Sequence, residues 1–340
     1  MQRSLVYILF ILFVFTACKT DEMLQYDLLN QTLYTFEVPS NFAEPRIPTD
    51  NILTEERIAL GKQLFFDNRL SRNLNFSCAS CHKPSLAFSD TILVPPGDMQ
   101  LIGKRGSPSL ANVAWHPYFF KEGGSPTLET QVQGPIENPE EMNFTFPEVI
   151  ERLGKIEAYQ ILAQIAYKRE FDAFVLTRAL GAFQRTLVSA NSTYDQYLAG
   201  TATLNDAELS GRDLFFGKAN CASCHTGADF TEYDFENNGL YENYEDVGLF
   251  RVSSDSLDIG KFKIPTLRNI ELTAPYMHNG GLKTLYEVVE HYNSGGKNHP
   301  NKSQKIEALQ LSTEEKANLV AFLKTLTDIS FTNNPTHIIE

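Results

Sequence analysis

The sequence, 340 residues long, predicts a mainly α-helical protein with two similar domains. The pentapeptide CASCH occurs at 78–82 and again at 221–225. The stretches before it, 53–66 and 204–216, also match, since each has acidic residues, a central glycine and a Leu-Phe-Phe end. A duplicated pattern indicates two domains of one type. No segment of the chain is rich in strand signals.

Each duplicated stretch reads as a capped helix that delivers the chain to its pentapeptide. Thr54 and Asn205 are suitable N-caps, because their side-chain oxygens can accept a hydrogen bond from the first helical turn. The acidic residues after them suit the positive end of a helix. We therefore expect one such helix at the start of each domain.

C-x-x-C-H is the attachment signature of a c-type haem. Two thiols three positions apart on one turn can form thioethers to the two vinyl groups of one porphyrin, and the next residue then directs its imidazole at the iron. A zinc site would need four nitrogen or sulfur ligands, and a redox C-x-x-C does not require the histidine. We predict two covalent c-type haems, one in each domain. The attachment cysteines are Cys78, Cys81, Cys221 and Cys224, and the proximal iron ligands are His82 and His225.

The N-terminus has the form of a secretory signal. Arg3 precedes an unbroken apolar run at 5–15, which is too short to cross a bilayer comfortably. The run ends in the sequence FTAC, which looks like a bacterial lipoprotein cleavage box. We predict a signal peptide at 1–18 and lipid anchoring at Cys18, on the periplasmic side of a bacterial membrane. An ordinary cleaved signal with an incidental cysteine is the alternative.

The rest of the chain divides into a tether and two haem domains. Residues 19–50 are polar and then proline-rich, which is typical of a tether. An N-terminal haem domain is predicted at 51–203 and a C-terminal haem domain at 204–330, with the last helix free to pack across both. The net charge of −13 argues against binding to nucleic acid or to anionic lipid, and permits a basic redox partner.

Helical signals are unevenly distributed. The Gly- and Pro-rich segment 83–142 reads as loop around a haem, and helices are predicted at 146–153, 158–167 and 171–189. The last of these carries an apolar stripe of Leu176, Leu180, Phe183 and Leu187. Near the C-terminus, Ser312 and Glu315 form a capping box. The amphipathic helix that follows is expected to pack on the first helix of its domain.

Five further stretches together resemble the bacterial dihaem cytochrome c peroxidase family, which includes the MauG-type enzymes. They are GKQLFFD at 61–67, SPSLAN at 107–112, LETQVQGPIENPEEM at 128–142, PTLRN at 265–269 and TAPYMHNG at 273–280. The resemblance extends from about 51 to 328. It implies that peroxide reacts at the N-terminal haem and that the C-terminal haem passes electrons or shares the oxidising equivalents.

The resemblance also implies the residues of the peroxide site. Gln131, Pro135 and Glu141 would line the pocket on the distal side of the first haem. Breaking the O–O bond heterolytically requires a proton to move from one peroxide oxygen to the other, and one carboxylate in reach can do both. Glu141 would fill this role. A solvated helix-start residue is the alternative interpretation of Glu141.

The family also binds a calcium ion between the domains, through backbone carbonyls that would here belong to Thr273 and Pro275. The Asn that often precedes the Ser-Pro of the family is Gly106 here. A second departure is that no histidine lies between His82 and His116, and Met99 is expected to be a loop residue. The first haem would therefore be open to peroxide without prior reduction.

A third departure concerns the path between the haems. Lys121 stands where the family usually has a Trp, and a lysine cannot relay an electron hole. Trp115, a tyrosine, or direct tunnelling between the haems would have to replace it. We expect His116, beside Trp115, to be a structural or pocket-edge residue.

The distal ligand of the second haem is predicted to be Tyr292. Family peroxidases place a Met fourteen positions after the histidine of the Pro-Tyr-x-His motif, and MauG-type enzymes place a Tyr there. Counting from His278 reaches Tyr292. Met277 and His291 are the rival ligands, although His291 would point about 100° away from Tyr292 on one helix. A tyrosine that merely packs on the haem edge is the alternative.

These observations predict an oxidoreductase: a dihaem peroxidase that reduces hydrogen peroxide to water at the N-terminal haem. Electrons would come through the C-terminal haem from a small redox protein, a cytochrome c or a cupredoxin. One alternative is a MauG-like oxidase that attacks a protein or organic substrate through a high-valent state. Another is a dihaem electron carrier without enzymatic activity. The sequence is also compatible with a homodimer.

Overall fold

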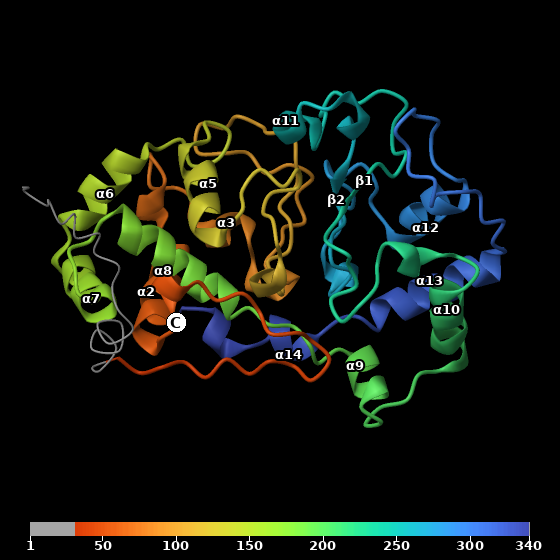
Figure 1. Cartoon of the computed structure of the whole chain (residues 1–340), viewed down its shortest axis with the longest axis horizontal. Coiled ribbons are helices and arrows are strands. Elements are labelled where there is room, and N and C mark those ends of the chain that lie inside the picture. Colours follow the sequence, from red (N-terminus) through yellow and green to blue (C-terminus); the bar gives the residue numbers. More distant parts are fainter. Residues whose placement is uncertain (1–30, 340) are drawn as a thin grey trace, which may run out of the picture.

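The computed structural model describes residues 31–339. The predicted signal peptide and Cys18 lie outside this range. The described chain forms two helical lobes side by side, with the N-terminal lobe on the left of Figure 1 and the C-terminal lobe on the right. The prediction of a mainly α-helical protein with two related domains is confirmed.

The first lobe contains α2 to α8, the second contains α9 to α13 with the two strands, and α14 packs back on the first lobe. The helices of the first lobe are α2 (Glu55–Phe65), α3 (Cys78–Cys81), α4 (Leu128–Gln131), α5 (Gln133–Glu137), α6 (Phe146–Gly154), α7 (Glu157–Tyr167) and α8 (Ala173–Arg185). The later helices are α9 (Thr193–Leu198), α10 (Asp206–Phe216), α11 (Phe250–Ser253), α12 (Leu285–Asn293), α13 (Thr313–Lys324) and α14 (Ile329–Thr332). Strands β1 (Phe235–Glu236) and β2 (Phe262–Lys263) pair antiparallel.

The predicted caps are present, and one predicted helix is shorter than expected. Thr54 accepts a hydrogen bond from Arg57 N, and both Asn205 and Ser312 form capping boxes. The helix predicted at 171–189 is α8, which ends at Arg185. Leu187 is fully buried, which is why it fits the apolar stripe of the predicted helix. It lies beyond the end of α8, however, and its carbonyl accepts a hydrogen bond from Asn112 N, in a different segment.

Two close helix crossings organise the lobes. Helix α2 packs on α8, and α10 packs on α13, as expected for the C-terminal amphipathic helix. A Cβ atom at Gly61 would overlap the carbonyl oxygen of Ala179, and one at Gly211 would overlap that of Asn318. Glycine is therefore required at both crossings because the two backbones touch there. Each crossing fixes the helix that leads into a CASCH motif.

The duplication continues beyond the motifs. Residues 108–135 and 265–292 lie 157 positions apart and share their backbone features. Asn112 and Asn269 both adopt left-handed conformations, with φ of 59° and 60°. Each then leads through a 3-10 turn to a bridged loop, which pairs Phe119 with Ser125 in one copy and Tyr276 with Leu282 in the other.

The equivalent segments meet across the boundary between the lobes. Gly106 N donates to His278 O at 3.2 Å, and Lys263 N donates to Lys121 O at 2.7 Å. Because Gly106 corresponds to Lys263 and Lys121 to His278, the two contacts are reciprocal. Such reciprocity is the mark of an approximate two-fold interface. The two lobes are thus joined through equivalent turns.

The described residues at this boundary do not fit the calcium ion that the family resemblance implied. Lys121 Nζ donates to His278 O at 3.0 Å and to Met277 O at 3.4 Å, so an ammonium group already uses carbonyls of this turn. Arg105 lies nearby and pairs with Glu122 and Asp246, the acidic groups at hand. A divalent cation next to two cationic side chains would be repelled. Nor does residue 106, a glycine, offer a side-chain ligand.

Both ends of the described chain pack on the first lobe. Residues 31–50, assigned to the tether from their prolines, form an ordered arm instead: Leu33 bridges to Thr54, and Trp115 packs between Phe36 and Phe42. At the other end, the segment after α13 returns to the N-terminal lobe, where the C-terminus lies beside α2 (Figure 1). There Phe331 and His337 both contact the ring of Phe88, with centroids 5.8 and 5.4 Å away.

Replacing Gly211 with alanine should destabilise the second lobe by about 3 kcal/mol, because the added methyl group would separate α10 from α13. The denaturation midpoint, followed by circular dichroism, measures the effect. Gly154→Ala is the matched control, since a Cβ atom there would meet its nearest neighbour at an ordinary 3.5 Å. A Gly211→Ala variant as stable as that control would contradict the close crossing.

Replacing Lys121 with methionine should lower the stability of the protein by about 1–3 kcal/mol, because buried carbonyls would lose their donor. Chelation of divalent cations should leave the unfolding midpoint of the unaltered protein unchanged. Lys283→Met, at an exposed position, controls for loss of a lysine. A midpoint that falls on chelation and recovers with added calcium would overturn the assignment of Lys121 as the cation of this interface.

Candidate haem sites and their surroundings

A single cavity of about 1180 Å³ runs through both lobes. Its wall includes both CASCH motifs, the two motif histidines, and residues from the turns that join the lobes. Single small-molecule sites usually measure about 300–1,000 Å³, so this cavity exceeds the size that one such ligand requires. The cavity therefore provides continuous space between the two motifs.

The two motif histidines are held in the same way. His82 Nδ1 lies 2.8 Å from Phe88 O, and His225 Nδ1 lies 3.0 Å from Phe230 O. Burial lowers the pKa of both imidazoles, that of His225 to about 4, and so favours the neutral form of each ring. A backbone carbonyl on Nδ1 fixes the tautomer that leaves Nε2 free for a metal. The residues present therefore fit a c-type haem in each lobe.

The predicted peroxide-site residues lie together on the wall of the cavity in the first lobe. Gln131 is the last residue of α4, Pro135 lies in α5, and Glu141 follows in the next turn. Asn138 Nδ2 donates to Glu141 Oε1 at 2.9 Å. Glu141 is exposed to this cavity, yet the surrounding chain limits its solvation and raises the pKa of its carboxyl group. Its charge also acts on the thiols of Cys78 and Cys81, which places it near the first motif.

Tyr292 occupies the position in the second lobe that Pro135 occupies in the first. It lies on α12, lines the cavity, and is 157 positions after Pro135. Burial raises the pKa of its phenol to about 12, a hydrogen bond with Asn238 lowers it, and the thiols of Cys221 and Cys224 raise it. The tyrosine therefore lies close to the second motif. A bound ferric iron would favour its deprotonated form, which burial alone opposes.

The rival ligands of the second lobe differ in position. Met277 also lines the cavity, but its sulfur accepts a hydrogen bond from Asn238 Nδ2 at 3.1 Å. His291 Nε2 lies 3.0 Å from Asn238 O, so its ring is engaged with the backbone. Asn238 thus contacts all three candidates. The sequence analysis did not identify this residue, and no local signal distinguishes it from a loop asparagine.

Of the remaining candidates, Met99 and Trp115 lie away from the cavity. Met99 is 51% exposed, and its sulfur lies 3.7 Å from Asn73 Nδ2. Trp115 donates from Nε1 to Ala43 O at 2.6 Å, so it packs under the N-terminal arm. His116 lines the cavity at the boundary between the lobes, and Lys121 and Thr273 also line it, as does Pro275.

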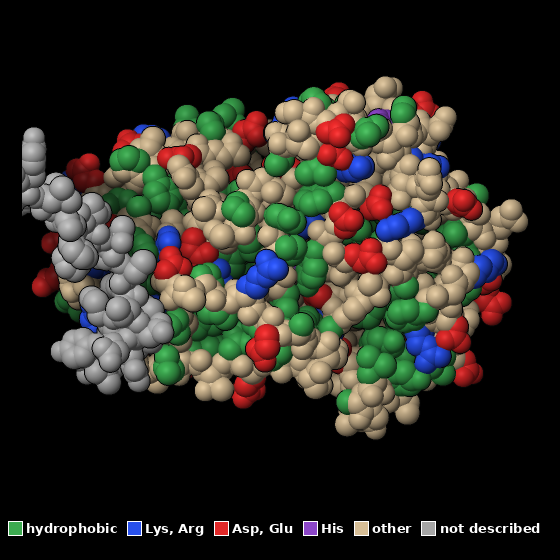
Figure 2. Space-filling view, viewed as in Figure 1, with side chains coloured by type: hydrophobic (Ala, Val, Ile, Leu, Met, Phe, Trp, Pro, Cys, Tyr) green, Lys and Arg blue, Asp and Glu red, His purple; other side chains and the backbone are tan. Residues whose placement is uncertain are grey.

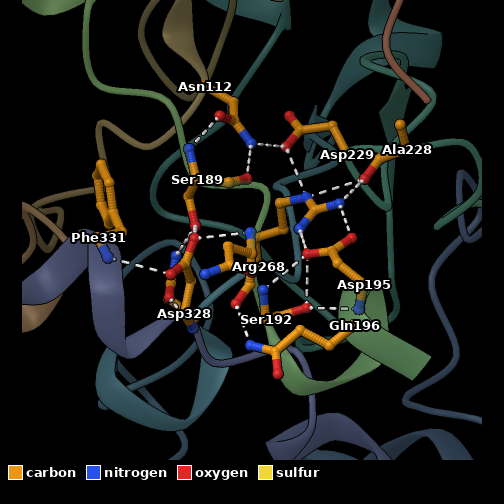
Figure 3. Close-up of polar contacts among 12 residues, drawn as sticks. Asn112, Ser189, Ser192, Asp195, Gln196, Ala228, Asp229, Arg268, Asp328 and Phe331 are labelled. Carbon is orange, nitrogen blue, oxygen red and sulfur yellow. Dashed lines mark hydrogen bonds and ion pairs between the residues drawn. The ribbon is translucent and has the colours of Figure 1, made fainter. Parts of the chain in front are cut away.

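A buried polar network joins the lobes behind the cavity (Figure 3). Asn112 donates to Ser189 O at 3.0 Å and to Asp229 Oδ1 at 2.7 Å. Arg268, fully buried, forms a two-pronged pair with Asp195 at 2.7 and 2.9 Å. Removing one partner of a buried ion pair destabilises the protein, because the other charge is left buried and unpaired. The pair therefore fixes how these segments pack together. Sequence analysis had placed Asn112 and Arg268 only within family motifs.

Within residues 31–339, no group of three or more His, Cys, Asp and Glu side chains is placed to hold a metal ion. No helix in the same range has the length and apolarity to cross a membrane. The face in Figure 2 mixes acidic and basic side chains without a continuous basic patch. The residues predicted to hold the haems and to form the peroxide site line the cavity.

Comparison with known proteins agrees with this arrangement. The family model for di-haem cytochrome c peroxidase matches residues 55–203, and that for cytochrome c matches residues 209–327. Methylamine utilization protein MauG of Methylorubrum extorquens is 39% identical over 82% of this chain and 80% of its own length. Cytochrome c551 peroxidase of Nitrosomonas europaea is 35% identical, over 84% of each chain.

Solved structures show the same similarity. A MauG-like protein associated with microbial copper homeostasis superposes with a TM-score of 0.85 at 36% identity, covering 90% of this chain and 99% of that one. The diheme peroxidase BthA of Burkholderia thailandensis shares the fold, with a TM-score of 0.72 and 24% identity over 83% of this chain and 88% of its own. With its two haem-attachment motifs and its two matched lobes, this chain belongs to the di-haem cytochrome c peroxidase and MauG family.

Proposed function

We propose that this protein reduces hydrogen peroxide to water in the first-lobe cavity, with electrons supplied through the second lobe. A small redox protein, a cytochrome c or a cupredoxin, is the proposed donor. The observation that carries the proposal is the Glu141 carboxyl group, which lies on the cavity wall near the first motif with a raised pKa. Relatives named as cytochrome-c peroxidases support the same reaction.

A difference between the equivalent positions supports reaction in the first lobe. Pro135 stands where the second lobe has Tyr292, and proline has no side-chain group that can bind a metal. The loop 83–105 contains no histidine, and Met99 faces outward. The far side of the first haem is therefore proposed to be accessible to peroxide. An electron carrier would need neither this access nor Glu141.

When bound, the haem supplies the iron and the electrons that the cleavage of peroxide requires. The chain supplies the proton transfer. Asn138 holds Glu141 Oε1, which leaves Oε2 to accept a proton from one peroxide oxygen and return it to the other, which departs as water. A carboxyl pKa raised toward neutrality matches the group better to this exchange. Gln131, on the same wall, is placed to orient the peroxide by hydrogen bonding.

A MauG-like oxidation of a protein or organic substrate is the second candidate. The observation that favours it is Tyr292 in the second lobe, near Cys221 and Cys224. A phenolate ligand is anionic and hard, so it favours Fe(III) over Fe(II) and lowers the reduction potential. This property suits a haem that shares an oxidising equivalent. The similarity to MauG points the same way.

Glu141→Gln should slow the reaction with peroxide by about 10²–10⁴-fold while both haems remain attached, because the variant cannot move the proton. Stopped-flow mixing of the ferric protein with peroxide measures the rate. In the unaltered protein the rate should rise with pH as Glu141 loses its proton, at a pH above the range of an ordinary glutamate. Glu137→Gln, on the exposed side of α5, should leave the rate unchanged. A wild-type rate in Glu141→Gln would refute the assignment.

Tyr292→Phe should change the absorption spectrum and raise the potential of the second haem alone, because its anionic ligand is lost. Spectroelectrochemical titration of the two haems gives both quantities. Tyr286→Phe, at a 56% exposed position on the same helix, is the control. If neither the spectrum nor the potential moves, Tyr292 is not a ligand and the MauG-like candidate loses its support.

A further inference from the structure

Tyr233 lies at the boundary between the lobes with its hydroxyl group on a buried carboxylate. Its Oη donates to Asp229 Oδ2 at 3.0 Å, and its backbone N–H binds Thr231 Oγ1 at 2.9 Å. The residue adopts a left-handed conformation, with φ of 58°. The strained backbone and the two hydrogen bonds together hold the ring in one orientation.

The carboxylate of Asp229 is positioned by both lobes. Only 4% of the residue is exposed, and its Oδ1 accepts a hydrogen bond from Asn112 Nδ2 at 2.7 Å (Figure 3). Thr266 Oγ1 donates to the same oxygen at 3.1 Å. Arg268 Nε lies 3.8 Å away. Oδ2 is left to the Tyr233 hydroxyl group, with His116 Nε2 3.6 Å from it. The tyrosine therefore has a fixed proton acceptor.

Short contacts lead from Tyr233 toward both haem sites. On one side, its ring centroid lies 5.1 Å from that of His116, which stacks on Phe119 at 6.5 Å, and both of these line the cavity with the first-lobe residues. On the other side, the preceding residue, Glu232, donates its N–H to Cys224 O at 3.1 Å. Tyr233 thus stands between the first-lobe wall and the second attachment motif.

The other aromatic candidates are less suited to carry an electron hole. Trp115 packs under the N-terminal arm, where its ring contacts Phe36 and Phe42 and its Nε1 donates to a backbone carbonyl, not to a base. Tyr244 donates to the amide oxygen of Asn237, which is a poor proton acceptor. Oxidation of a tyrosine is easy only when its proton has somewhere to go, because the protonated phenol radical is a very strong acid. Among these candidates, Tyr233 has both the location and the base.

We propose that Tyr233 is a redox-active tyrosine that relays oxidising equivalents between the two haem sites, with Asp229 holding its proton. The relay rests on the proposed function, in which peroxide is the oxidant. One electron leaves the Tyr233 ring toward the first lobe, and the phenolic proton moves to Asp229 Oδ2. One electron from the second lobe then restores the phenol, and the same proton returns. No proton is gained or lost overall, and Lys121 has no part in the transfer.

The test uses the holoprotein with both haems attached. After rapid mixing with peroxide and freezing, electron paramagnetic resonance should detect the signal of a tyrosyl radical. The line shape of this signal should change when ring-deuterated tyrosine is incorporated. Tyr233→Phe should lose this signal, and Tyr118→Phe, a 46% exposed neighbour, should keep it. Oxidation of the second lobe after peroxide addition should be slower in D₂O than in H₂O, and Tyr233→Phe should lose this isotope effect.

Asp229→Asn removes the proton acceptor while keeping a side chain of nearly the same size and shape. It should retain both haems and lose the tyrosyl signal, because an amide cannot take the proton. A variant that fails to fold would lack the wild-type haem spectra, and Tyr233→Phe then decides alone. A radical signal and an isotope effect that survive in Tyr233→Phe would overturn the relay. If the unaltered protein does not react with peroxide at all, the proposed function fails first.

Discussion

The structure depends on two helix crossings in which backbone meets backbone. At Gly61 and Gly211 even a methyl group would overlap the facing helix, so each pair of helices has one permitted depth of contact. The first helix of each pair precedes a CASCH motif along the chain, and the second is followed by a residue whose carbonyl accepts a hydrogen bond from Asn112 N or Asn269 N. The crossings therefore determine where each motif histidine and each following turn lies.

Two copies of one arrangement have diverged at a few equivalent positions, and these differences carry the chemistry. Pro135 corresponds to Tyr292, so the cavity wall carries a pyrrolidine ring in one lobe and a phenol in the other. Lys121 corresponds to His278, and the two turns bind each other across the boundary. The charged groups also differ between the lobes, with Glu141 on the cavity wall of the first lobe and the Asp229–Arg268 pair near the second motif. We therefore propose that these departures from symmetry determine the function.

Local signals predicted the parts of the structure that depend on local physics. The caps at Thr54 and Asn205 and the helix after Ser312 were predictable because each depends on residues within one turn. The arm at 31–50 was not, since its prolines suggested a tether while its aromatic residues pack on Trp115. The contact of Tyr233 with Asp229 was missed because nothing in the sequence marks a base for a loop tyrosine.

The central claim is that two equivalent haem sites differ in their distal position, one open and one ligated by tyrosine. Electron paramagnetic resonance of the fully ferric protein as isolated tests it most directly, because spin state reports axial ligation. The account predicts one high-spin signal from the first site, opposite Pro135, and a separate signal from the second site that Tyr292→Phe alters. Two low-spin signals of histidine–histidine or histidine–methionine type would contradict it.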